Sequence, residues 1–352
     1  MNHLSQITRR HLLQSSLFGT FFSAFSGKWV FSSTDENPNN SSESLANLTK
    51  NDLSPIRFSF SLNDNEAVFY ISGLTESSKI MLIADTHLFR DDERGQAFQT
   101  YSGRMAGAYN QTTHFRTGQT TNPESAFLET LKMAQEKKVD SIALLGDMLS
   151  FPTESGRDWL LEQLNASSIP FHYISGNHDW HYEGLPGSKN DLRNEWIEKR
   201  LKPLYQGNCP LMYAVQMKGM RLVFIDDSTY EILPEQLEFF QNELAFKQPT
   251  VLFMHIPPFA PGRSVGFGLG HPNWNAQSDH SFEIERRPRW PESGHNETTI
   301  AFYNEILSSP HLLGTFSGHI HIQSLDIING KPLVVVPTNT QAAYMIAHFR
   351  PL

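Results

Sequence analysis

Five short polar motifs, each directly following an apolar run, place the strongest constraint on how this 352-residue chain can fold. Apolar runs of this length are typical of buried strands. In chain order, the runs are Ile80–Ala84, Ile142–Leu145, Phe171–Ile174, Val251–Met254 and Leu312–Phe316. The motifs that follow them are Asp85-Thr86-His87, Gly146-Asp147, Gly176-Asn177-His178-Asp179, His255 and Gly318-His319-Ile320-His321. Because ligands of an open α/β sheet bind beyond the carboxyl ends of its strands, the motifs predict one shared site.

The side chains of these motifs are carboxylates, imidazoles and one ligand amide, a donor set that suits Mn, Fe or Zn. The only cysteine, Cys209, belongs to none of the motifs, so no thiolate is offered. Each motif alone is weak support, because an Asp-x-His triplet arises by chance and a lone histidine after a strand is more often a hydrogen-bonded core or surface residue. All five in order favour a pair of metal ions.

The order of the motifs, with glycine before the second, third and fifth, resembles the calcineurin-like metallophosphoesterase superfamily. The resemblance runs from about Lys79 to the C-terminus. It implies an α/β fold of two packed mixed β-sheets flanked by helices, the four-layer sandwich of metallo-dependent phosphatases. A βαβα opening followed by a strand-rich second half favours the same architecture.

By this resemblance, seven residues hold two metal ions and Asp147 bridges them. The first ion would be held by Asp85, His87, Asp147 and His321, and the second by Asp147, Asn177, His255 and His319. A carboxylate has two oxygens and can serve two cations, whereas the neutral Asn177 amide limits the negative charge. We expect His319 and His321 to project to one side of an extended segment, because alternate residues of such a segment share a face. Each could then reach a different ion.

The third motif also supplies two candidate catalytic residues. The resemblance implies that His178 faces the substrate as a proton donor or phosphate clamp. Asp179 would hold the His178 imidazole and favour its protonated form. A purely structural His–Asp pair is the alternative. Ser150 stands where the purple acid phosphatase branch has a metal-binding tyrosine, so an iron–tyrosinate site is not expected.

Two neighbouring metal ions can share a hydroxide and clamp a phosphate group. We therefore expect a metallophosphoesterase that hydrolyses phosphomonoesters or small phosphodiesters, with a bridging hydroxide attacking phosphorus. A cyclic-nucleotide or nucleotide phosphodiesterase is an alternative, because the Gly-Asn-His-Asp form also occurs in that branch. A metal-containing binding or scaffold protein is a second alternative, although the complete ligand set argues against it.

The net charge of −9 and the pI of about 5.9 predict no general attraction to nucleic acid. A small phosphoester remains the expected partner, because bound metal cations attract it locally. No motif indicates the oligomeric state.

Residues 1–31 resemble a bacterial twin-arginine export signal, in which Arg9-Arg10 precedes an uncharged stretch from Leu12 to Ser26. We predict export to the periplasm through the twin-arginine machinery. No stable membrane anchor is expected, because polar residues interrupt the stretch. The alternative is an amphipathic or disordered N-terminus with an incidental Arg-Arg pair. Residues 32–54 are predicted to form a polar linker, and residues 55–352 the phosphoesterase domain.

The remaining patterns predict the secondary structure of this domain and two long connections. A β-hairpin is expected over 56–72, and a helix beginning at Pro123 with Asn122 as its N-cap. Further helices are predicted over 157–165, 190–205, 234–246 and 297–307, and further strands over 212–217, 221–225, 324–328, 332–336 and 342–348. The long polar segments 88–121 and 256–295 are interpreted as loops at the mouth of the site. For 256–295, a solvated insertion is an equal alternative.

Overall fold

The computed structural model describes residues 55–263, 268–278 and 292–352. The predicted signal peptide and linker lie outside the described residues, as do parts of the second long segment at 264–267 and 279–291. Within the described ranges, no helix has both the length and the apolar character needed to cross a membrane.

The first large sheet is mixed and has the strand order β1-β2-β14-β3-β6-β7. Strands β3, β6 and β7 run parallel to one another, whereas β14, near the C-terminus, pairs antiparallel with β3 and parallel with β2. The bounds are β1 Phe58–Asn63, β2 Glu66–Ile71, β14 Met345–Pro351, β3 Ser78–Ile83, β6 Ser141–Leu145 and β7 Phe171–Ile174. The predicted hairpin is thus confirmed as β1 and β2, and it extends one edge of this sheet.

The second large sheet is also mixed, with the order β12-β13-β11-β10-β9-β8. Its four central strands are parallel, and an antiparallel strand closes each edge. The bounds are β12 Ser324–Ile328, β13 Lys331–Val335, β11 Leu312–Ser317, β10 Thr250–Phe253, β9 Met220–Ile225 and β8 Met212–Met217. A short hairpin, β4 Thr112–Thr113 and β5 Thr120–Thr121, stands apart from both sheets.

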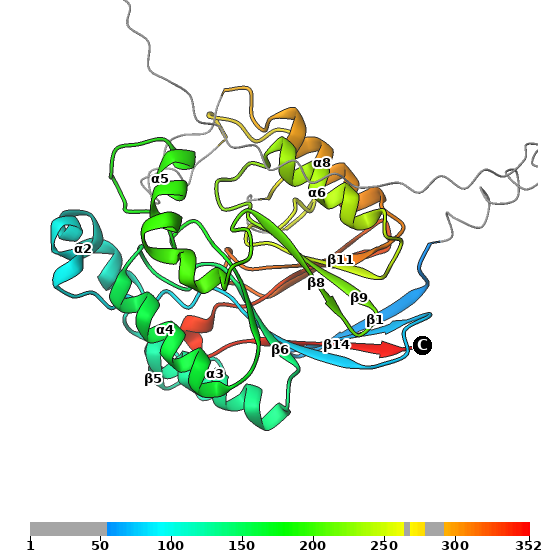
Figure 1. The fold of residues 1–352 in the computed structure, drawn as a ribbon, viewed down its shortest axis with the longest axis horizontal. Coiled ribbons are helices and arrows are strands. Elements are labelled where there is room, and N and C mark those ends of the chain that lie inside the picture. The colour runs from blue at the N-terminus through cyan, green and yellow to red at the C-terminus, as the bar shows by residue number, and fades with distance from the viewer. Residues whose placement is uncertain (1–54, 264–267, 279–291) are drawn as a thin grey trace, which may run out of the picture. The chain divides into compact units, whose positions relative to one another are not determined.

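Helices cover the outer face of each sheet, and the two inner faces pack on each other (Figure 1). The α-helices are α2 Gln99–Ala108, α3 Pro123–Lys137, α4 Glu154–Ser167, α5 Lys189–Trp196, α6 Pro234–Leu244 and α8 Glu297–Ser308. A π-helix, Ile197–Leu201, continues α5, and 3₁₀ helices cover Glu93–Phe98, Lys202–Tyr205 and Asn339–Gln341. This arrangement confirms the predicted four layers.

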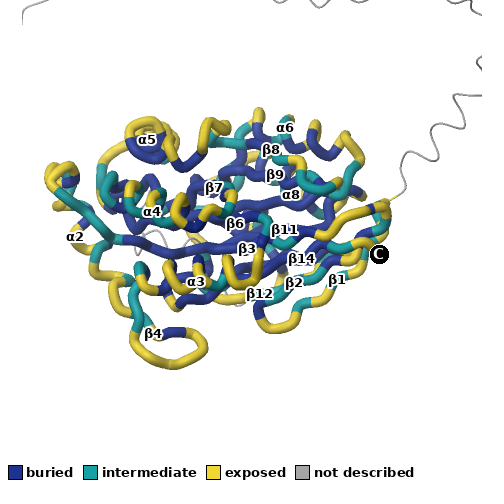
Figure 2. The backbone as a smooth tube through the Cα atoms, turned by 60° about the horizontal axis from the view of Figure 1, so that its bottom comes forward, coloured by how far each residue is buried: buried dark blue, intermediate teal, exposed yellow. Residues whose placement is uncertain are grey.

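Strand β3 shows why the sequence forms layers. Its alternate residues Ile80 and Leu82 pack between the two sheets, while Met81 and Ile83 pack under the helices on the outer face. This is the two-residue period expected of a strand. Because both faces are covered, most residues of the central strands are buried, whereas the β4–β5 hairpin is largely exposed (Figure 2).

Two sequence predictions differ from the structure in detail. The segment 88–121 is not one irregular loop, because it contains a 3₁₀ helix, α2 and the β4–β5 hairpin. The strand predicted over 342–348 begins only at Met345. Ala342 has a positive φ of 60° and ends a 3₁₀ turn, and Thr340 in that turn donates its N–H to the Asp85 carbonyl. A turn that supports the site therefore replaces the start of the strand.

Candidate metal centre

The predicted ligands gather at the carboxyl ends of five parallel-paired strands from both sheets. Asp85 follows β3, Asp147 follows β6, Asn177 follows β7, His255 follows β10, and His319 follows β11. In both sheets these ends lie at one edge because neighbouring strands run parallel. The topology thus produces the convergence that the strand-end motifs predict.

The first group contains Asp85, His87 and His321, whose donor atoms lie within 4.8 Å of one another. The Nε2 atoms of His87 and His321 are 3.0 Å apart, and Nε2 of His321 lies 3.5 Å from Oδ1 of Asp85. Asp85 and His87 are fully buried, while the His321 side chain is 27% exposed. Three donors therefore lie close together, and two of them belong to fully buried side chains.

The second group contains Asp147, His255 and His319, also with donor atoms within 4.8 Å of one another. His255 Nε2 lies 3.2 Å from Asp147 Oδ2 and 3.2 Å from the Asn177 side-chain oxygen. Asn177 thus joins this group, as the resemblance implies.

Asp147 lies between the two groups. Its Oδ2 atom is 3.2 Å from His255 Nε2 and 4.0 Å from His87 Nε2, so one oxygen faces histidines of both groups. Its Oδ1 atom accepts the backbone N–H of His178 at 2.7 Å. The position suits a bridging ligand, although the second oxygen is already engaged by the main chain.

Burial and neighbouring charges shift the pKa values of the two histidines in the first group. Burial, followed by repulsion from His178 and His321, lowers the pKa of His87 well below its usual value. Burial also acts to lower the pKa of His321, but the Asp85 carboxylate outweighs it and raises that pKa. Two imidazoles whose pKa values are shifted in opposite directions therefore face each other, with their Nε2 atoms 3.0 Å apart. A metal ion needs both rings to offer an unprotonated nitrogen.

The second group shows the same pattern. Burial is the largest influence on His255 and lowers its pKa, but the neighbouring Asp147 carboxylate more than compensates and raises the pKa to about 10. Burial acts to raise the pKa of Asp147, but His255, His178 and His87 together outweigh it and keep that pKa well below its usual range. Burial lowers the pKa of His319 well below its usual value. Both groups thus offer carboxylate and imidazole donors, and both fit a metal ion.

Five of the predicted ligands have left-handed backbone conformations. The φ angles are 55° at Asp85, 52° at His87, 51° at Asp147, 72° at His319 and 61° at His321. Such angles are uncommon for residues other than glycine and cost about 1–3 kcal/mol each, so they persist only where the surroundings impose them. The expectation of an extended segment at His319 and His321 is therefore wrong. The two rings still reach different groups, because the chain bends at each residue.

Glycines before the motifs allow the loops to approach closely. A Cβ atom on Gly146 would lie 2.5 Å from His255 Nδ1, and one on Gly176 would collide with Asp147. Gly146 also has a φ of 86°, which side chains rarely tolerate. The glycines seen in the sequence are thus required by the approach of one ligand loop to the next.

Groups behind the ligands fix their orientation. His255 Nδ1 donates to the Leu145 carbonyl at 2.7 Å, which leaves Nε2 to face the centre. The buried Asp227 accepts the backbone N–H groups of His255 and Ile256 at 2.9 and 3.1 Å. Burial raises the pKa of Asp227 to about 7. No motif in the sequence marked Asp227, because its role is carried by main-chain contacts.

Comparison with known families agrees with this geometry. The calcineurin-like phosphoesterase family matches residues 78–323, which is most of the chain and includes all seven predicted ligands. The chain belongs to the calcineurin-like phosphoesterase family. A search of curated proteins returns no match.

Several solved structures are similar to this phosphoesterase at low sequence identity. A dimetal phosphatase from Danio rerio is 13% identical, with 78% of this chain and 93% of that chain covered and a TM-score of 0.47. A purple acid phosphatase from yellow lupin (Lupinus luteus) seeds is 14% identical, with 79% and 47% covered and a TM-score of 0.44. A phosphopantetheinyl hydrolase from Mycobacterium tuberculosis is 12% identical, with 75% and 91% covered and a TM-score of 0.38.

The structure of this phosphoesterase places His178 at the centre but corrects the role expected for Asp179. One ring nitrogen of His178 lies within 4.8 Å of the donor atoms of His87 and Asp147. Asp179 instead accepts the backbone N–H groups of Leu149 at 2.7 Å and Gly176 at 2.8 Å. Burial, followed by the charge of Asp147, raises the pKa of Asp179 to about 7.

The expected pairing of Asp179 with the His178 ring is therefore wrong. Asp179 joins two ligand loops, and a carboxyl group with a raised pKa is a poor partner for an imidazolium ion. The ring partner of His178 is the Ser150 carbonyl, 3.4 Å from Nδ1. Because a carbonyl only accepts, this contact requires a proton on Nδ1 and turns Nε2 away from Ser150.

Sequence reasoning missed a ring from the segment 88–121 that covers the first group. Tyr109, directly after α2, stacks on His87 with ring centroids 4.1 Å apart and meets the edge of His321 at 5.4 Å. The interpretation of 88–121 as a mouth segment predicted such contacts only in general terms. The polar composition gave no sign that one aromatic residue would reach a ligand.

Proposed function

We propose that this phosphoesterase hydrolyses phosphomonoesters or small phosphodiesters with two metal ions (Mn, Fe or Zn) at the candidate centre. The observation that carries the proposal is the convergence of carboxylate and imidazole donors from both sheets into two groups that meet at Asp147. The proposed ligands are Asp85, His87, Asp147, Asn177, His255, His319 and His321.

When bound, a pair of such ions supplies a nucleophile from water at neutral pH and neutralises charge on the phosphoryl oxygens. The chain contributes the arrangement around that chemistry. Asp147 faces both groups, and Asn177 adds an oxygen without a further negative charge. The close glycine approaches and the buried Asp227 hold the ligand loops in place before substrate arrives, which lowers the cost of assembling the reactive geometry.

His178 is the proposed proton donor to the departing alcohol, or a clamp on the phosphate. Its backbone N–H binds Asp147, and its ring contacts the Ser150 carbonyl, so both ends of the residue are held at the centre. A donor must lie within hydrogen-bond reach of the leaving group. The position of His178 beside both His87 and Asp147 meets that need for a phosphate bound between the groups.

Hydrolysis is tested with p-nitrophenyl phosphate and bis(p-nitrophenyl) phosphate after loading with Mn²⁺, Fe²⁺ or Zn²⁺. We expect turnover of at least one ester, and the ratio of the two rates separates monoesterase from diesterase activity, including the nucleotide phosphodiesterase alternative. Substituting a residue that hydrogen-bonds to a metal ligand typically lowers activity by roughly tenfold to a hundredfold. Asp147→Asn changes a proposed ligand itself and should lower kcat/KM by more than this. Asp140→Asn, which alters a partly exposed carboxylate bound to Lys218, is the control.

If protein shown to contain metal hydrolyses neither ester, the proposal is contradicted and a metal-containing binding or scaffold protein is favoured. Full activity of Asp147→Asn would contradict the assignment of the centre.

We also propose export to the periplasm through the twin-arginine machinery. The support is the sequence of residues 1–31, where Arg9-Arg10 precedes an uncharged stretch. Export of folded protein by this route would let the metal ions be loaded before transport. Cell fractionation of the full chain and of Arg9→Lys/Arg10→Lys tests this proposal. Periplasmic accumulation that the double substitution does not reduce would contradict it.

A further inference from the structure

A small pocket of about 90 Å³ opens beside the candidate centre. Its lining residues are Arg104, Met105, Ala108, Tyr109, Ser150, His178 and Glu183. His178 and Tyr109 belong both to this pocket and to the surroundings of the predicted ligands. A phosphate group at the metal centre would therefore place its ester substituent at the pocket entrance. The volume is well below the roughly 300–1,000 Å³ of pockets for drug-sized ligands, so only a small substituent fits.

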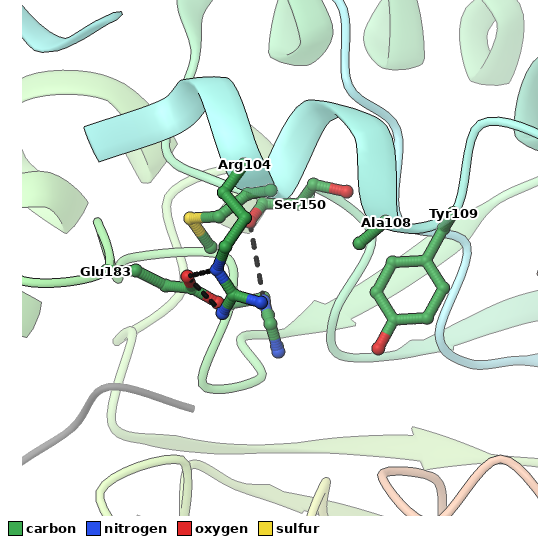
Figure 3. A pocket seen from close by; sticks show the side chains of 7 residues that line it. Arg104, Ala108, Tyr109, Ser150 and Glu183 are labelled. Carbon is green, nitrogen blue, oxygen red and sulfur yellow. Dashed lines mark hydrogen bonds and ion pairs between the residues drawn. The ribbon is translucent and has the colours of Figure 1, made fainter. Parts of the chain in front are cut away.

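Opposite chemistries line different parts of this pocket. Met105, Ala108 and the Tyr109 ring, all from α2 and the residue after it, provide apolar surface. Arg104, from the same helix, reaches across to Glu183 (Figure 3). The Arg104 Nε atom donates to a Glu183 carboxylate oxygen at 2.7 Å, and the same oxygen contacts Nη2.

The charge of this end of the pocket depends on both members of the ion pair. The Glu183 side chain is 6% exposed, whereas that of Arg104 is 46% exposed. A buried carboxylate is costly unless it is paired, so Arg104 neutralises a negative charge that would otherwise face the substrate. A second anionic group would meet Glu183, while Arg104 is already bound to it. A hydroxyl group can donate to the carboxylate and accept from the guanidinium.

We propose that the Arg104–Glu183 pair selects phosphoesters of small neutral alcohols that carry a further hydroxyl group, and rejects esters that carry a second anionic group there. This inference rests on the proposed phosphoesterase function and names its substrate class. Arg104 and Glu183 act as specificity residues, because they contact the substituent rather than the reacting phosphorus. A site built to hydrogen-bond a hydroxyl group discriminates strongly against analogues that leave its polar groups unpaired.

The test uses two substrates of nearly equal size that differ in one group. Glycerol 3-phosphate ends in a CH₂OH group where 3-phosphoglycerate ends in a carboxylate. The ratio of their kcat/KM values cancels general effects of a variant on metal content or folding. Their phosphonates, 3,4-dihydroxybutylphosphonate and 2-hydroxy-4-phosphonobutanoate, provide the same comparison by calorimetric binding, without turnover.

Substitutions of the two partners should move this ratio in opposite directions. Glu183→Gln removes the negative charge beside Arg104, so we expect preference for 3-phosphoglycerate to rise by about tenfold to a hundredfold, as for hydrogen bonds to charged groups. Arg104→Gln leaves Glu183 unneutralised and should lower that preference by about tenfold. Wild type should prefer glycerol 3-phosphate.

Matched controls lie in other ion pairs. Arg94→Gln alters an arginine that is 43% exposed and bound to Asp92 and Asp158, and Glu243→Gln alters a largely buried glutamate bound to Arg221. Neither residue lines the pocket, so neither substitution should change the ratio.

Each outcome has a defined meaning. Opposite shifts of the ratio in kinetics and in phosphonate binding support the inference. Parallel losses for both substrates, an unchanged ratio, or hydrolysis of p-nitrophenyl phosphate without preference between the pair overturn it while leaving the proposed function intact. Binding of the phosphonates with opposite shifts, but no hydrolysis of any ester, overturns the proposed function and leaves the recognition by Arg104 and Glu183 standing. Lack of both binding and hydrolysis overturns both.

Discussion

The two groups of predicted ligands differ in what holds their histidine rings. In the second group, His255 Nδ1 donates to a main-chain carbonyl at the end of β6. In the first group, His87 Nδ1 has no hydrogen-bond partner within the described ranges, and the ring stacks on Tyr109 instead. His255 of the second group is therefore oriented by the core of the fold. His87 of the first group instead packs against a side chain from the segment 88–121.

Because of this difference, we expect the His255 ring to be held more rigidly than the His87 ring. A hydrogen bond to the second ring nitrogen fixes the tautomer and direction of a metal-binding histidine, whereas an aromatic stack contributes about 0.5–1.5 kcal/mol without fixing the tautomer. Tyr109 also lines the pocket beside His178. The first group is thus the one whose metal affinity we expect to respond to changes near the substrate.

The largest expected effect concerns pH and the second group. The pKa of His255 is raised from 6.5 to about 10, so a metal ion must displace its proton. Affinity at this group should rise about tenfold per pH unit between pH 7 and 9. In the metal-free protein, the stability of the fold changes with pH in the opposite direction. Protonated His255 stabilises the folded state fully below about pH 6.5, and this stabilisation is lost as the pH rises toward 10.

Metal titration calorimetry at pH 7, 8 and 9 checks the first statement, and thermal unfolding of metal-free protein checks the second. Affinity of the second group that does not change between pH 7 and 9 would contradict the raised pKa of His255. His255→Gln should remove both dependences and serves as the control.

The next effect comes from Asp227, which supports only the second group. Asp227→Ala leaves the N–H groups of His255 and Ile256 without their acceptor, at a cost of about 1–3 kcal/mol in unfolding free energy. Metal affinity of the second group should fall by about tenfold to a hundredfold. Asp227→Asn keeps an acceptor oxygen and should retain most of both quantities. Equal losses from the two substitutions, measured by metal analysis and denaturant unfolding, would show that charge matters more than the hydrogen bonds.

The first group has its own backbone test at Gly318. A Cβ atom there would lie 2.6 Å from Ala84 Cβ and 2.7 Å from Asp85 Oδ2. We expect Gly318→Ala to destabilise the protein by about 1–3 kcal/mol through overpacking and to weaken binding of the metal ion at the first group. Gly107→Ala, in α2 with open space around it, should be neutral or stabilising by up to about 1 kcal/mol. Similar chemical denaturation midpoints for the two variants would contradict this account of the loop approach.

The smallest effect isolates the Tyr109 stack. Tyr109→Ala should lower the affinity of the first group for its metal ion by about twofold to tenfold, because the lost ring contact is worth about 0.5–1.5 kcal/mol. Tyr109→Phe keeps the ring and should retain the affinity. The second metal ion should be unaffected by either change. Competitive chelator titrations measure the affinity of each metal ion. Equal loss of affinity for both ions in Tyr109→Ala would contradict the distinction between the groups.

The sequence predicted the parts of this molecule that depend on local pattern. The apolar runs, the helix cap at Asn122 and the hairpin over 56–72 each follow from short-range preferences, and all are confirmed. The convergence of the ligands also followed, because strand ends of parallel strands share an edge. The family resemblance then supplied which side chains belong to which group.

The failures share a different physical origin. His319 and His321 have left-handed backbone conformations, and the sequence carries no signal for a left-handed histidine. Asp179 follows His178 in the chain, but its carboxylate turns toward two backbone amides on separate loops. Tyr109 reaches His87 only once the fold has formed. The contacts of Asp179 with Leu149 and of Tyr109 with His87 join residues that are distant in sequence, so local patterns do not encode them.

The most direct test of the central claim is anomalous diffraction from crystals grown with Mn²⁺. We expect two peaks about 3.5–4 Å apart, one beside Asp85, His87 and His321 and the other beside Asn177, His255 and His319, with Asp147 between them. A single peak, peaks elsewhere in the molecule, or none at this position would contradict it.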